Sequence, residues 1–299
     1  MISLFRNRLT SMTVVVAAKK NIEMDDLTIS GIFISPIKSL SGLSLTSSNV
    51  EKRGLQYDRR WVLVNDENLF IHQRDHNEMA LLQPAISEDS MVITQKNDPT
   101  VRHEFPLKPE GTIRENVTVW DDTCTAVEVS EKTSAWFTKK LKINCRLMYM
   151  ADDSIRLADP RYSIKSDDKV SFADGYPILA ISEQSMELLN SKTEVAIPAD
   201  RFRTNFIIKG GHPHVEDELR SFSIGKTQYY GVKPCARCIM TTVDQETAAR
   251  GKEPLKSLAT YRKKGNKILF GHNIIPMGIG NVKVGDTISV KEWSKPLAF

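Results

Sequence analysis

The sequence predicts a mainly β protein of the α+β class, built from two barrel-like β domains. Short runs rich in β-branched and aromatic residues are separated by polar breaks along most of the chain. Only two segments, 134–141 and the one that follows Ser182, have apolar residues at helical spacing. Strands that follow one another without intervening helices are typical of barrels and argue against a doubly wound parallel sheet.

Strand patterns begin close to the N-terminus. The segment 28–35 (TISGIFIS) is rich in β-branched residues and ends at a proline. The segment 60–64 (RWVLV) runs into a polar turn at 65–68 and resumes with three apolar residues, which predicts a hairpin with a longer loop. We therefore expect a β-rich domain over 28–150, preceded by an N-terminal extension over 1–27.

The two helical segments differ in how clearly their starts are marked. The segment 134–141 (SAWFTKKL) places two aromatic residues and a leucine at helical spacing. Ser182 is predicted to be an N-cap, and Glu183 in the first turn is placed favourably for the helix dipole. The polar segment 152–174 has no clear periodicity and predicts a long connection. The second domain, together with this linker, is expected to span 151–299.

Strand patterns return in the second half of the chain. They cover 203–208, 222–224, 226–230 and 238–243, and the segment 280–290 predicts a strand, a turn and a last strand.

Composition excludes several classes of protein. The 299 residues include 41 basic and 37 acidic ones, and a net charge of +4 is too even for a nucleic-acid-binding protein, which usually has a clustered basic excess. No run approaches the ~20 apolar residues that would span a bilayer, so no membrane span is expected. Four cysteines are too few for a disulfide scaffold and suggest a reducing compartment.

The expected location is cytoplasmic, with a mitochondrial location as the alternative. The first acidic residue is Glu23, and four basic residues precede it, as in a weak organelle presequence. An irregular extension explains the same segment.

The most informative stretch is 233–244 (KPCARCIMTTVD), which contains a Cys-x-x-Cys pair. A structural zinc site would need two further ligands, but the other cysteines, Cys124 and Cys145, lie far apart in the sequence. A thioredoxin-type pair would open a helix, whereas the run from Cys238 onward predicts a strand. The pair alone is also typical of two buried structural cysteines, and the residues by themselves leave these alternatives open.

The whole stretch resembles the cysteine motif of MOSC-domain proteins, the family named after the C-terminal domain of molybdenum-cofactor sulfurase. The likeness is greatest to the group of the mitochondrial amidoxime-reducing component and its bacterial relatives, where the motif runs Cys-x-Arg-Cys-Ile-x-Thr-Thr-Val-Asp. It extends over about 29–290 and includes Ser-Pro-Ile-Lys-Ser at 35–39 and Tyr-Asp-Arg-Arg-Trp at 57–61. The resemblance implies an N-terminal β-rich domain and a MOSC β-barrel, with a cofactor in the cleft between them.

The cofactor implied by the resemblance is a molybdenum–molybdopterin. Because the pterin already provides a dithiolene pair, the protein needs to add only one soft thiolate. By resemblance that metal ligand and catalytic residue is Cys238, while Cys235 lies beside the site without binding the metal. Ala236 and Arg237 belong to the same cofactor-binding loop, where Arg237 is expected to favour the thiolate of Cys238.

The cofactor also carries a phosphate, which needs converging cationic and amide donors. Lys38 and Ser39 match the family's Pro-x-Lys-Ser element, and Arg59 matches its Asp-Arg element. Arg203 and Asn205 match its Arg-x-Asn element. The resemblance therefore predicts that these five residues converge on the cofactor, although they lie far apart in the sequence.

Four further residues are weaker candidates. Ser182 is expected either to reach the pterin or to serve only as a helix cap. Asp244 follows Cys238 by six residues and is expected either to relay protons during catalysis or to form a turn. His72 and His272 are alternative proton relays.

The reaction that the resemblance implies is molybdenum-dependent reduction of small N-hydroxylated substrates such as amidoximes or hydroxylamines. Alternatives are a carrier that hands cofactor or sulfur to other enzymes, and a metal-free binding module. No cysteine follows Cys238 to hold a ferredoxin-like cluster, and no Gly-x-Gly-x-x-Gly element is present. Electrons are therefore expected from a separate protein, such as a cytochrome b5-like donor or a ferredoxin or flavoprotein reductase, docked with help from charge.

Overall fold

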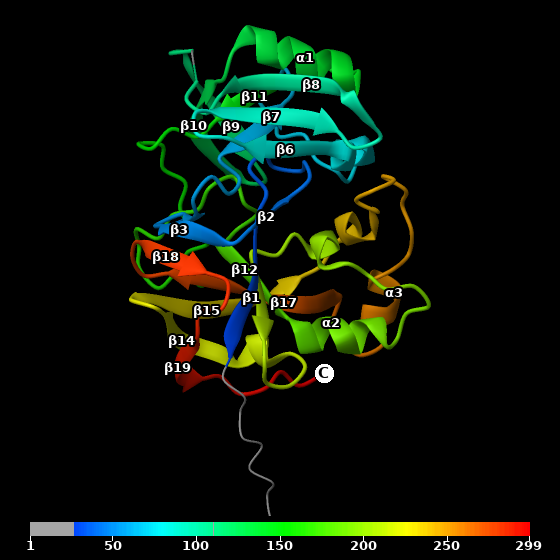
Figure 1. Cartoon of the computed structure of the whole chain (residues 1–299). Coiled ribbons are helices and arrows are strands. Elements are labelled where there is room, and N and C mark those ends of the chain that lie inside the picture. Colours follow the sequence, from blue (N-terminus) through cyan, green and yellow to red (C-terminus); the bar gives the residue numbers. More distant parts are fainter. Residues whose placement is uncertain (1–26, 110) are drawn as a thin grey trace, which may run out of the picture.

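Strands predominate in the computed structural model, which describes residues 27–109 and 111–299. Two halves are stacked in Figure 1, the upper one carrying the sheet β6–β8 and helix α1, and the lower one the largest sheet. Except for Leu27, the expected N-terminal extension over 1–27 lies outside the described residues. Leu27 is buried in the core of the lower half.

The lower half is built on a nine-stranded sheet in the order β19-β14-β15-β17-β12-β13-β1-β2, with β16 paired to β17. Its strands, in chain order, are β1 (Thr28–Ile34), β2 (Leu43–Leu45), β12 (Ile178–Ser182), β13 (Phe206–Lys209), β14 (Leu219–Ile224), β15 (Thr227–Ala236), β16 (Lys263–Lys264), β17 (Lys267–Pro276) and β19 (Ile288–Trp293). A small sheet of β18 (Gly280–Lys283), β3 (Ser47–Glu51) and β4 (Gly54–Leu55) lies beside it.

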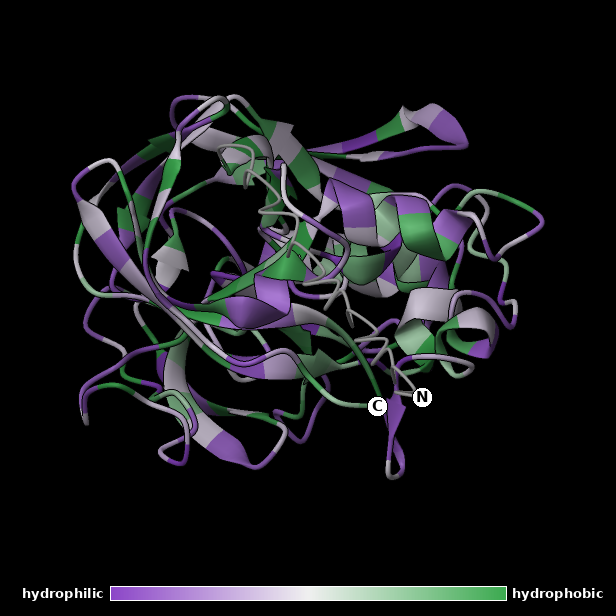
Figure 2. Ribbon diagram, turned by 90° about the horizontal axis from the view of Figure 1, so that it is seen from below, coloured by the Kyte–Doolittle hydropathy of each residue, from purple (hydrophilic) through white to green (hydrophobic). Residues whose placement is uncertain are grey.

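Backbone hydrogen bonds close the large sheet into the barrel that the sequence predicts. The amide of Ile29 donates to the carbonyl of Asp286 at 2.9 Å, and the amide of Ile288 donates to the carbonyl of Leu27 at 2.7 Å. The start of β1 therefore lies beside the start of β19, and closure removes both exposed edges there. Hydrophobic segments gather inside the molecule and hydrophilic ones along its outer loops (Figure 2).

The upper half contains two further sheets and one helix. One sheet has the order β5-β11-β10-β9 and the other the order β6-β7-β8. Their bounds are β5 (Trp61–Val64), β6 (Leu82–Ile86), β7 (Ser90–Gln95), β8 (Asp98–Pro106), β9 (Arg114–Val119), β10 (Asp122–Glu128) and β11 (Arg146–Tyr149). The hairpin predicted after β5 is confirmed, because Val64 and Phe70 form an antiparallel bridge.

Both predicted helices are present. Helix α1 (Glu131–Leu141) begins one turn earlier than predicted, because Ser130 is its N-cap and accepts from the amide of Thr133 at 3.2 Å. Helix α2 (Glu183–Asn190) begins after Ser182, as predicted. The remaining helical segments are α3 (Leu255–Leu258), η1 (Asn77–Leu81), η2 (Ala199–Phe202), η3 (Val215–Glu218) and η4 (Ile239–Thr242). None of the helices in the described ranges is long and apolar enough to cross a membrane.

Two predicted strands were wrong in ways that matter for the site. The strand predicted over 203–208 starts only at Phe206, because Arg203 has a left-handed backbone with φ 54°. The strand predicted over 238–243 is instead the 3₁₀ turn η4. The Thr241 and Thr242 hydroxyls donate to carbonyls three residues earlier, at 2.9 and 2.7 Å, and this local bonding overrides the β propensity of the run.

The long connection predicted over 152–174 is confirmed, since it holds no strand or helix. It leads from the upper half back to the barrel.

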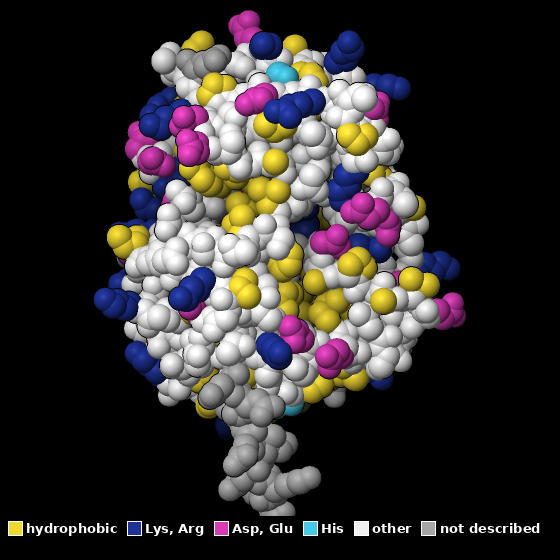
Figure 3. Space-filling view, viewed as in Figure 1, with side chains coloured by type: hydrophobic (Ala, Val, Ile, Leu, Met, Phe, Trp, Pro, Cys, Tyr) yellow, Lys and Arg dark blue, Asp and Glu magenta, His cyan; other side chains and the backbone are white. Residues whose placement is uncertain are grey.

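The expected domain boundary near 150 does not coincide with the division between sheets, because residues 28–55 pair with strands of the C-terminal part. The chain thus crosses between the halves more than once, and loops from both halves meet at the cleft between them. Hydrophobic side chains gather at this level in Figure 3.

Candidate functional site

Three loops from distant parts of the sequence meet at the cleft, and each turns on a residue with a left-handed backbone. Ser39, Arg59 and Arg203 have φ values of 72°, 50° and 54°. Of the nine non-glycine residues with positive φ in the described part of the chain, four line the cleft, the fourth being Trp120. Such conformations cost free energy and gather at binding and catalytic sites.

Hydrogen bonds tie these loops to one another. The buried carboxylate of Asp58 accepts from the amide of Ser35 at 2.7 Å and from Nη1 of Arg59 at 2.6 Å. Nη2 of Arg59 donates to the carbonyl of Arg203 at 2.7 Å, and Nη1 of Arg203 donates to the carbonyl of Leu40 at 2.6 Å. The loops that carry the predicted phosphate-binding residues are therefore held together before any ligand binds.

Lys38 lies in this cleft beside a single carboxylate. Its Nζ donates to Oδ1 of Asp174 at 2.6 Å, and Nε1 of Trp120 donates to the same oxygen at 3.0 Å. Burial lowers the pKa of Lys38 to about 8. The charge of Asp174 raises the pKa and offsets this effect only in part, while the like charges of Arg156 and Arg59 lower it further. Solvent reaches 61% of the Asp174 side chain, so the pair lies at the mouth and its attraction is partly screened.

Arg203 has one guanidinium nitrogen without a partner. Its Nη2 is buried and forms no hydrogen bond within the described residues. Burial, followed by the like charge of Arg59, lowers the pKa of Arg203, although a guanidinium keeps its proton. Leaving a buried charged donor unsatisfied costs about 1–3 kcal/mol, so an anion that accepts a hydrogen bond from this nitrogen would be stabilised here. A phosphate group would supply the missing acceptor and charge.

Binding of an anion here should weaken as pH rises through about 8. Lys38 is protonated below its pKa of about 8 in the empty protein, and a bound anion raises that pKa. Affinity should be full below pH 8 and then fall by up to about tenfold per pH unit, because binding must restore the lost proton. Calorimetric titration of cofactor-free protein with inorganic phosphate from about pH 6.5 to about pH 9.5 measures this. The Lys38→Gln variant should show a flatter profile, and an identical profile in both proteins would contradict this role of Lys38.

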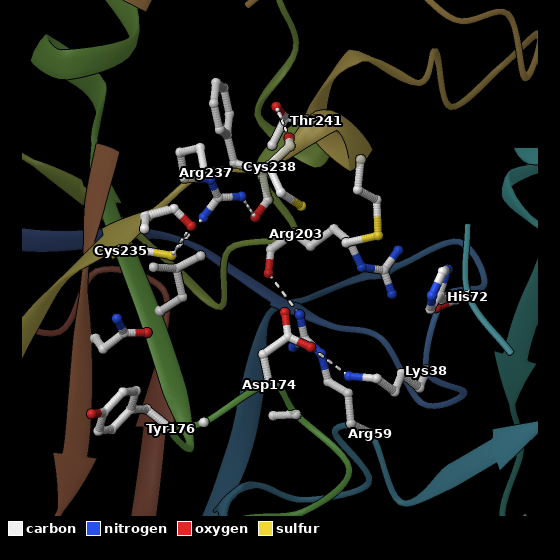
Figure 4. Close-up of a pocket in the computed structure, with 18 of the residues that line it drawn as sticks. Lys38, Arg59, His72, Asp174, Tyr176, Arg203, Cys235, Arg237, Cys238 and Thr241 are labelled. Atoms are coloured by element: carbon white, nitrogen blue, oxygen red, sulfur yellow. Dashed lines mark hydrogen bonds and ion pairs between the residues drawn. The ribbon is translucent and has the colours of Figure 1, made fainter. Parts of the chain in front are cut away.

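The cysteine loop approaches the same cleft from the barrel. Strand β15 ends at Ala236, and the amide of Arg237 donates to the carbonyl of Ile268 at 2.8 Å. The amide and hydroxyl of Thr241 both donate to the carbonyl of Cys238, at 3.1 and 2.9 Å. Cys238 is thereby fixed at the start of η4, with its thiol free and partly exposed. Figure 4 shows its sulfur turned toward the space above Arg203 and Asp174.

Arg237 lines the cleft and contacts the first cysteine of the pair. Its Nη1 lies 3.0 Å from the sulfur of Cys235, and its Nη2 donates to the carbonyl of Phe202 at 2.6 Å. The guanidinium thus contacts Cys235, and its predicted effect on the Cys238 thiolate stays a prediction. The cause of this contact is geometric, since residues two apart on extended backbone have side chains on the same side.

Together these loops enclose a cleft of about 830 Å³, part of it open to solvent. Lys38, Ser39, Arg59, Arg203, Asn205, Ala236, Arg237 and Cys238 all line it. Five cationic side chains face it, including Arg74 and Arg237, against the one carboxylate of Asp174. Two partly exposed thiols, those of Cys235 and Cys238, and an excess of positive charge therefore share one cavity.

Two of the predicted cofactor-binding residues, Ser182 and Asn205, use their side-chain hydrogen bonds within the protein. Ser182 is fully buried outside the lining, where its hydroxyl accepts from the amide of Ser185 and donates to Glu216, so it is a helix cap. Asn205 lines the cleft, but its amide accepts from the amide of Leu179 and donates to the carbonyl of Phe33. Asn205 therefore ties the strands together and has few hydrogen bonds left for a ligand.

Of the three candidate proton relays, only His72 lines the cleft. Asp244 does not line the cleft, and its carboxylate accepts from the amides of Glu246 and Thr247, which makes it a turn-forming residue. His272 is buried against Asp217 and likewise lies outside the lining. His72 does line the cleft, and burial lowers its pKa, so it is neutral near pH 7.

Three contributors to the cleft have no clear signal in the sequence. Asp174 and Gly175 lie at the end of the long connection, where an Asp-Gly pair predicts a turn but not its contact with Lys38. Trp120 follows β9, and the guanidinium of Arg74 lies 4.3 Å from its ring centroid. These residues reach the cleft only through the tertiary fold.

The Cys-x-x-Cys alternatives can be compared with the structure. Within the described ranges, no three His, Cys, Asp or Glu side chains gather as a metal site requires, whereas a structural zinc site needs four protein ligands. All four cysteines are free. The turn after Cys238 is a short 3₁₀ segment, not the α-helix of a thioredoxin-type motif.

Fold and site together define a two-part β protein whose barrel presents a Cys-x-x-Cys loop to a cleft rich in cationic side chains. Residues 167–289 match the family model of the MOSC domain, and residues 26–144 match that of the MOSC N-terminal beta barrel domain. The chain therefore belongs to the MOSC-domain family, in the form that also carries this N-terminal domain.

Named relatives are similar over most of the chain. Mitochondrial amidoxime-reducing component 1 of Mus musculus is 28% identical over 279 residues, which is 87% of this chain and 81% of the relative. Molybdenum cofactor sulfurase of Oryza sativa subsp. japonica is 28% identical over 268 residues, 83% of this chain but only 32% of that longer protein. Among solved structures, the YUAD protein from Bacillus subtilis matches with a TM-score of 0.42 and 13% identity, covering 90% of this chain and 97% of that one.

Proposed function

We propose that the chain binds a molybdenum–pterin cofactor in the cleft and uses it to reduce N-hydroxylated compounds. The observation that carries the proposal is the free thiol of Cys238, which shares a cleft with Lys38, Arg59 and the unpartnered Nη2 of Arg203, whereas the neighbouring thiol of Cys235 contacts Arg237. A soft thiolate suits molybdenum, and the buried cations suit a phosphate. The names of the relatives support the same cofactor and the N-reductive activity.

The chain's own residues would divide the work by position. The cations of Lys38, Arg59 and Arg203 bind the phosphate, while the Cys238 thiolate binds the metal. The hydrogen bonds from Thr241 to the Cys238 carbonyl hold that loop in place. When bound, the cofactor supplies the two electrons that cleave the N–O bond. Substrate, two electrons and two protons give the N-reduced product and water, which balances the reaction.

The experiment that tests this function also tests the electron supply. We expect no turnover of a benzamidoxime-type substrate with NADH or NADPH alone, because the turn between β12 and α2, which lead to the parallel strand β13, has no glycine-rich element that would bind a dinucleotide. Turnover should appear with a chemically reduced viologen dye, or with a cytochrome b5-like or ferredoxin-type donor and its reductase. Rapid NADH-driven turnover by the purified protein alone would contradict the proposal.

A carrier of cofactor or sulfur is the second candidate, favoured by the sulfurase relatives and by the partial exposure of Cys238. A carrier should release its cofactor readily to an apo-enzyme. A reductase should retain it through many turnovers. Transfer to an apo-molybdoenzyme, followed by metal analysis of both proteins, separates the two.

A further inference from the structure

The cleft that contains Cys238, called here the inner chamber, adjoins a second and larger cavity. This outer chamber has a volume of about 1760 Å³, including space open to solvent. The two chambers share seven lining residues: Trp120, Asp174, Gly175, Tyr176, Cys235, Ala236 and Asn273. They therefore adjoin at these residues, which include part of the cysteine loop, and the outer chamber is open to solvent.

The walls of the outer chamber differ from those of the inner one. Four of its eight charged lining residues pair with each other, Arg156 with Asp122 at 2.8 Å and Arg161 with Asp159 at 2.7 Å. Apolar side chains between them stay exposed. Ile155 is 58% exposed, Leu157 49% and Trp120 37%. Exposed apolar groups gathered in a cavity mark a surface that binds an apolar partner or ligand.

Aromatic side chains line the passage toward the inner chamber. Tyr176 lines both chambers, and its hydroxyl is buried without a hydrogen-bond partner among the described residues. The ammonium of Lys233 lies 5.7 Å from the Tyr176 ring centroid and 4.6 Å from that of Tyr162. In Figure 4 the Tyr176 ring points away from Lys38 and Arg203, so it faces the outer side of the junction. A flat ligand ring can pack against such a surface.

Gly175 keeps this junction open. It lines both chambers, and a Cβ built on it would meet no atom within 4 Å. Its backbone is not in the left-handed region, so a side chain can be added there without strain. Any larger residue at 175 would therefore project into the passage between the chambers.

We propose that the outer chamber binds the aromatic or other flat apolar part of an N-hydroxylated substrate, whose N–O group passes Gly175 to reach the inner chamber. This inference rests on the proposed function. It adds where the substrate binds and why the chain would accept bulky aromatic substrates as well as small ones. The inner chamber, with its excess of cations, is left to the anionic cofactor.

The Gly175→Phe variant tests the proposal. We expect the KM for a benzamidoxime-type substrate to rise by at least roughly tenfold, while that for N-methylhydroxylamine changes little, because only the large substrate needs the whole passage. Molybdenum content should be unchanged. Calorimetric binding of benzamidine, the reduced product, to the molybdenum-loaded protein should be lost. The matched control is Gly278→Phe, since Gly278 is equally open and lies outside both chambers.

Equal KM changes for the two substrates, unchanged benzamidine binding, or an equal effect of the control would overturn the proposal. Loss of molybdenum from Gly175→Phe would also overturn it, because residue 175 would then belong to the cofactor site. The proposed function can fail separately. If the loaded wild-type protein reduces no N–O compound but binds benzamidine, and only Gly175→Phe abolishes that binding, the outer chamber stands and the reductase assignment falls.

Discussion

Replacement of Cys238 by serine should abolish the reduction of benzamidoxime-type substrates. Both cysteines of the pair line the inner chamber, but the Cys238 sulfur is turned toward Arg203 whereas that of Cys235 contacts Arg237, and a serine hydroxyl is a poor replacement for a soft thiolate ligand. Changes to outer-shell groups of metal sites typically cost 10–100-fold, so loss of the ligand itself should cost more than about 100-fold. Initial rates with a reduced viologen donor measure the effect.

The matched control is Cys235→Ser, which removes the neighbouring thiol of the same motif. Cys235 contacts the Arg237 guanidinium at 3.0 Å and is not needed as a ligand, so measurable activity should remain. Equal loss from both substitutions, together with bound zinc, would show that the pair acts as one metal or redox unit and that the assignment of Cys238 is wrong.

Replacement of Arg203 by alanine should lower cofactor occupancy while the protein stays folded. Its free Nη2 is the buried donor that best accounts for an anion in the cleft. A hydrogen bond to a charged group contributes about 1.5–3 kcal/mol, which is about tenfold to a hundredfold in affinity. Lys38→Ala and Arg59→Ala should act in the same direction. Occupancy is measured as molybdenum per chain after purification, and folding as the melting temperature.

A suitable control for this series is Arg102→Ala, because Arg102 is 59% exposed and pairs only with the exposed Glu104. Its occupancy should equal that of the wild type. If Arg203→Ala, Lys38→Ala and Arg59→Ala all retain full occupancy, the phosphate binds elsewhere and the inner chamber has another purpose.

The sequence predicts the fold well where local signals and the final packing agree. The strand at 28–35, the hairpin after Trp61 and the cap at Ser182 are all present, because alternating burial, turn residues and capping hydroxyls act locally. The strand predicted after Cys238 was wrong. Its β-branched residues predict a strand, but two threonine hydroxyls donate to nearby carbonyls and stabilise a 3₁₀ turn.

The candidate site was predictable in its residues but not in its geometry. The resemblance names Lys38, Arg59 and Arg203, and the structure brings them together through hydrogen bonds between distant loops. Periodicity cannot reveal the left-handed backbone at Arg203, which places its side chain in the cleft. The contact of Arg237 with Cys235, by contrast, follows from the extended backbone there, which puts side chains two residues apart on the same side.

Asp174 and Gly175 show the same limit more sharply. Both lie at the end of a segment without periodicity. The contact of Asp174 with Lys38, and the junction that Gly175 lines, exist only when the two halves of the molecule meet. Asp244 is a residue that the sequence suggested and the structure places outside the cleft. Its position six residues from Cys238 suggested a catalytic carboxylate. Its oxygens instead accept from the turn that follows it.

The measurement that tests the central claim most directly is the metal and phosphate content of the full-length protein, purified from a host that makes the molybdenum cofactor. The account predicts close to one molybdenum per chain, with pterin phosphate in equal amount, and neither in Cys238→Ser. A protein that binds no molybdenum under these conditions, or that holds zinc in its place, would contradict the account.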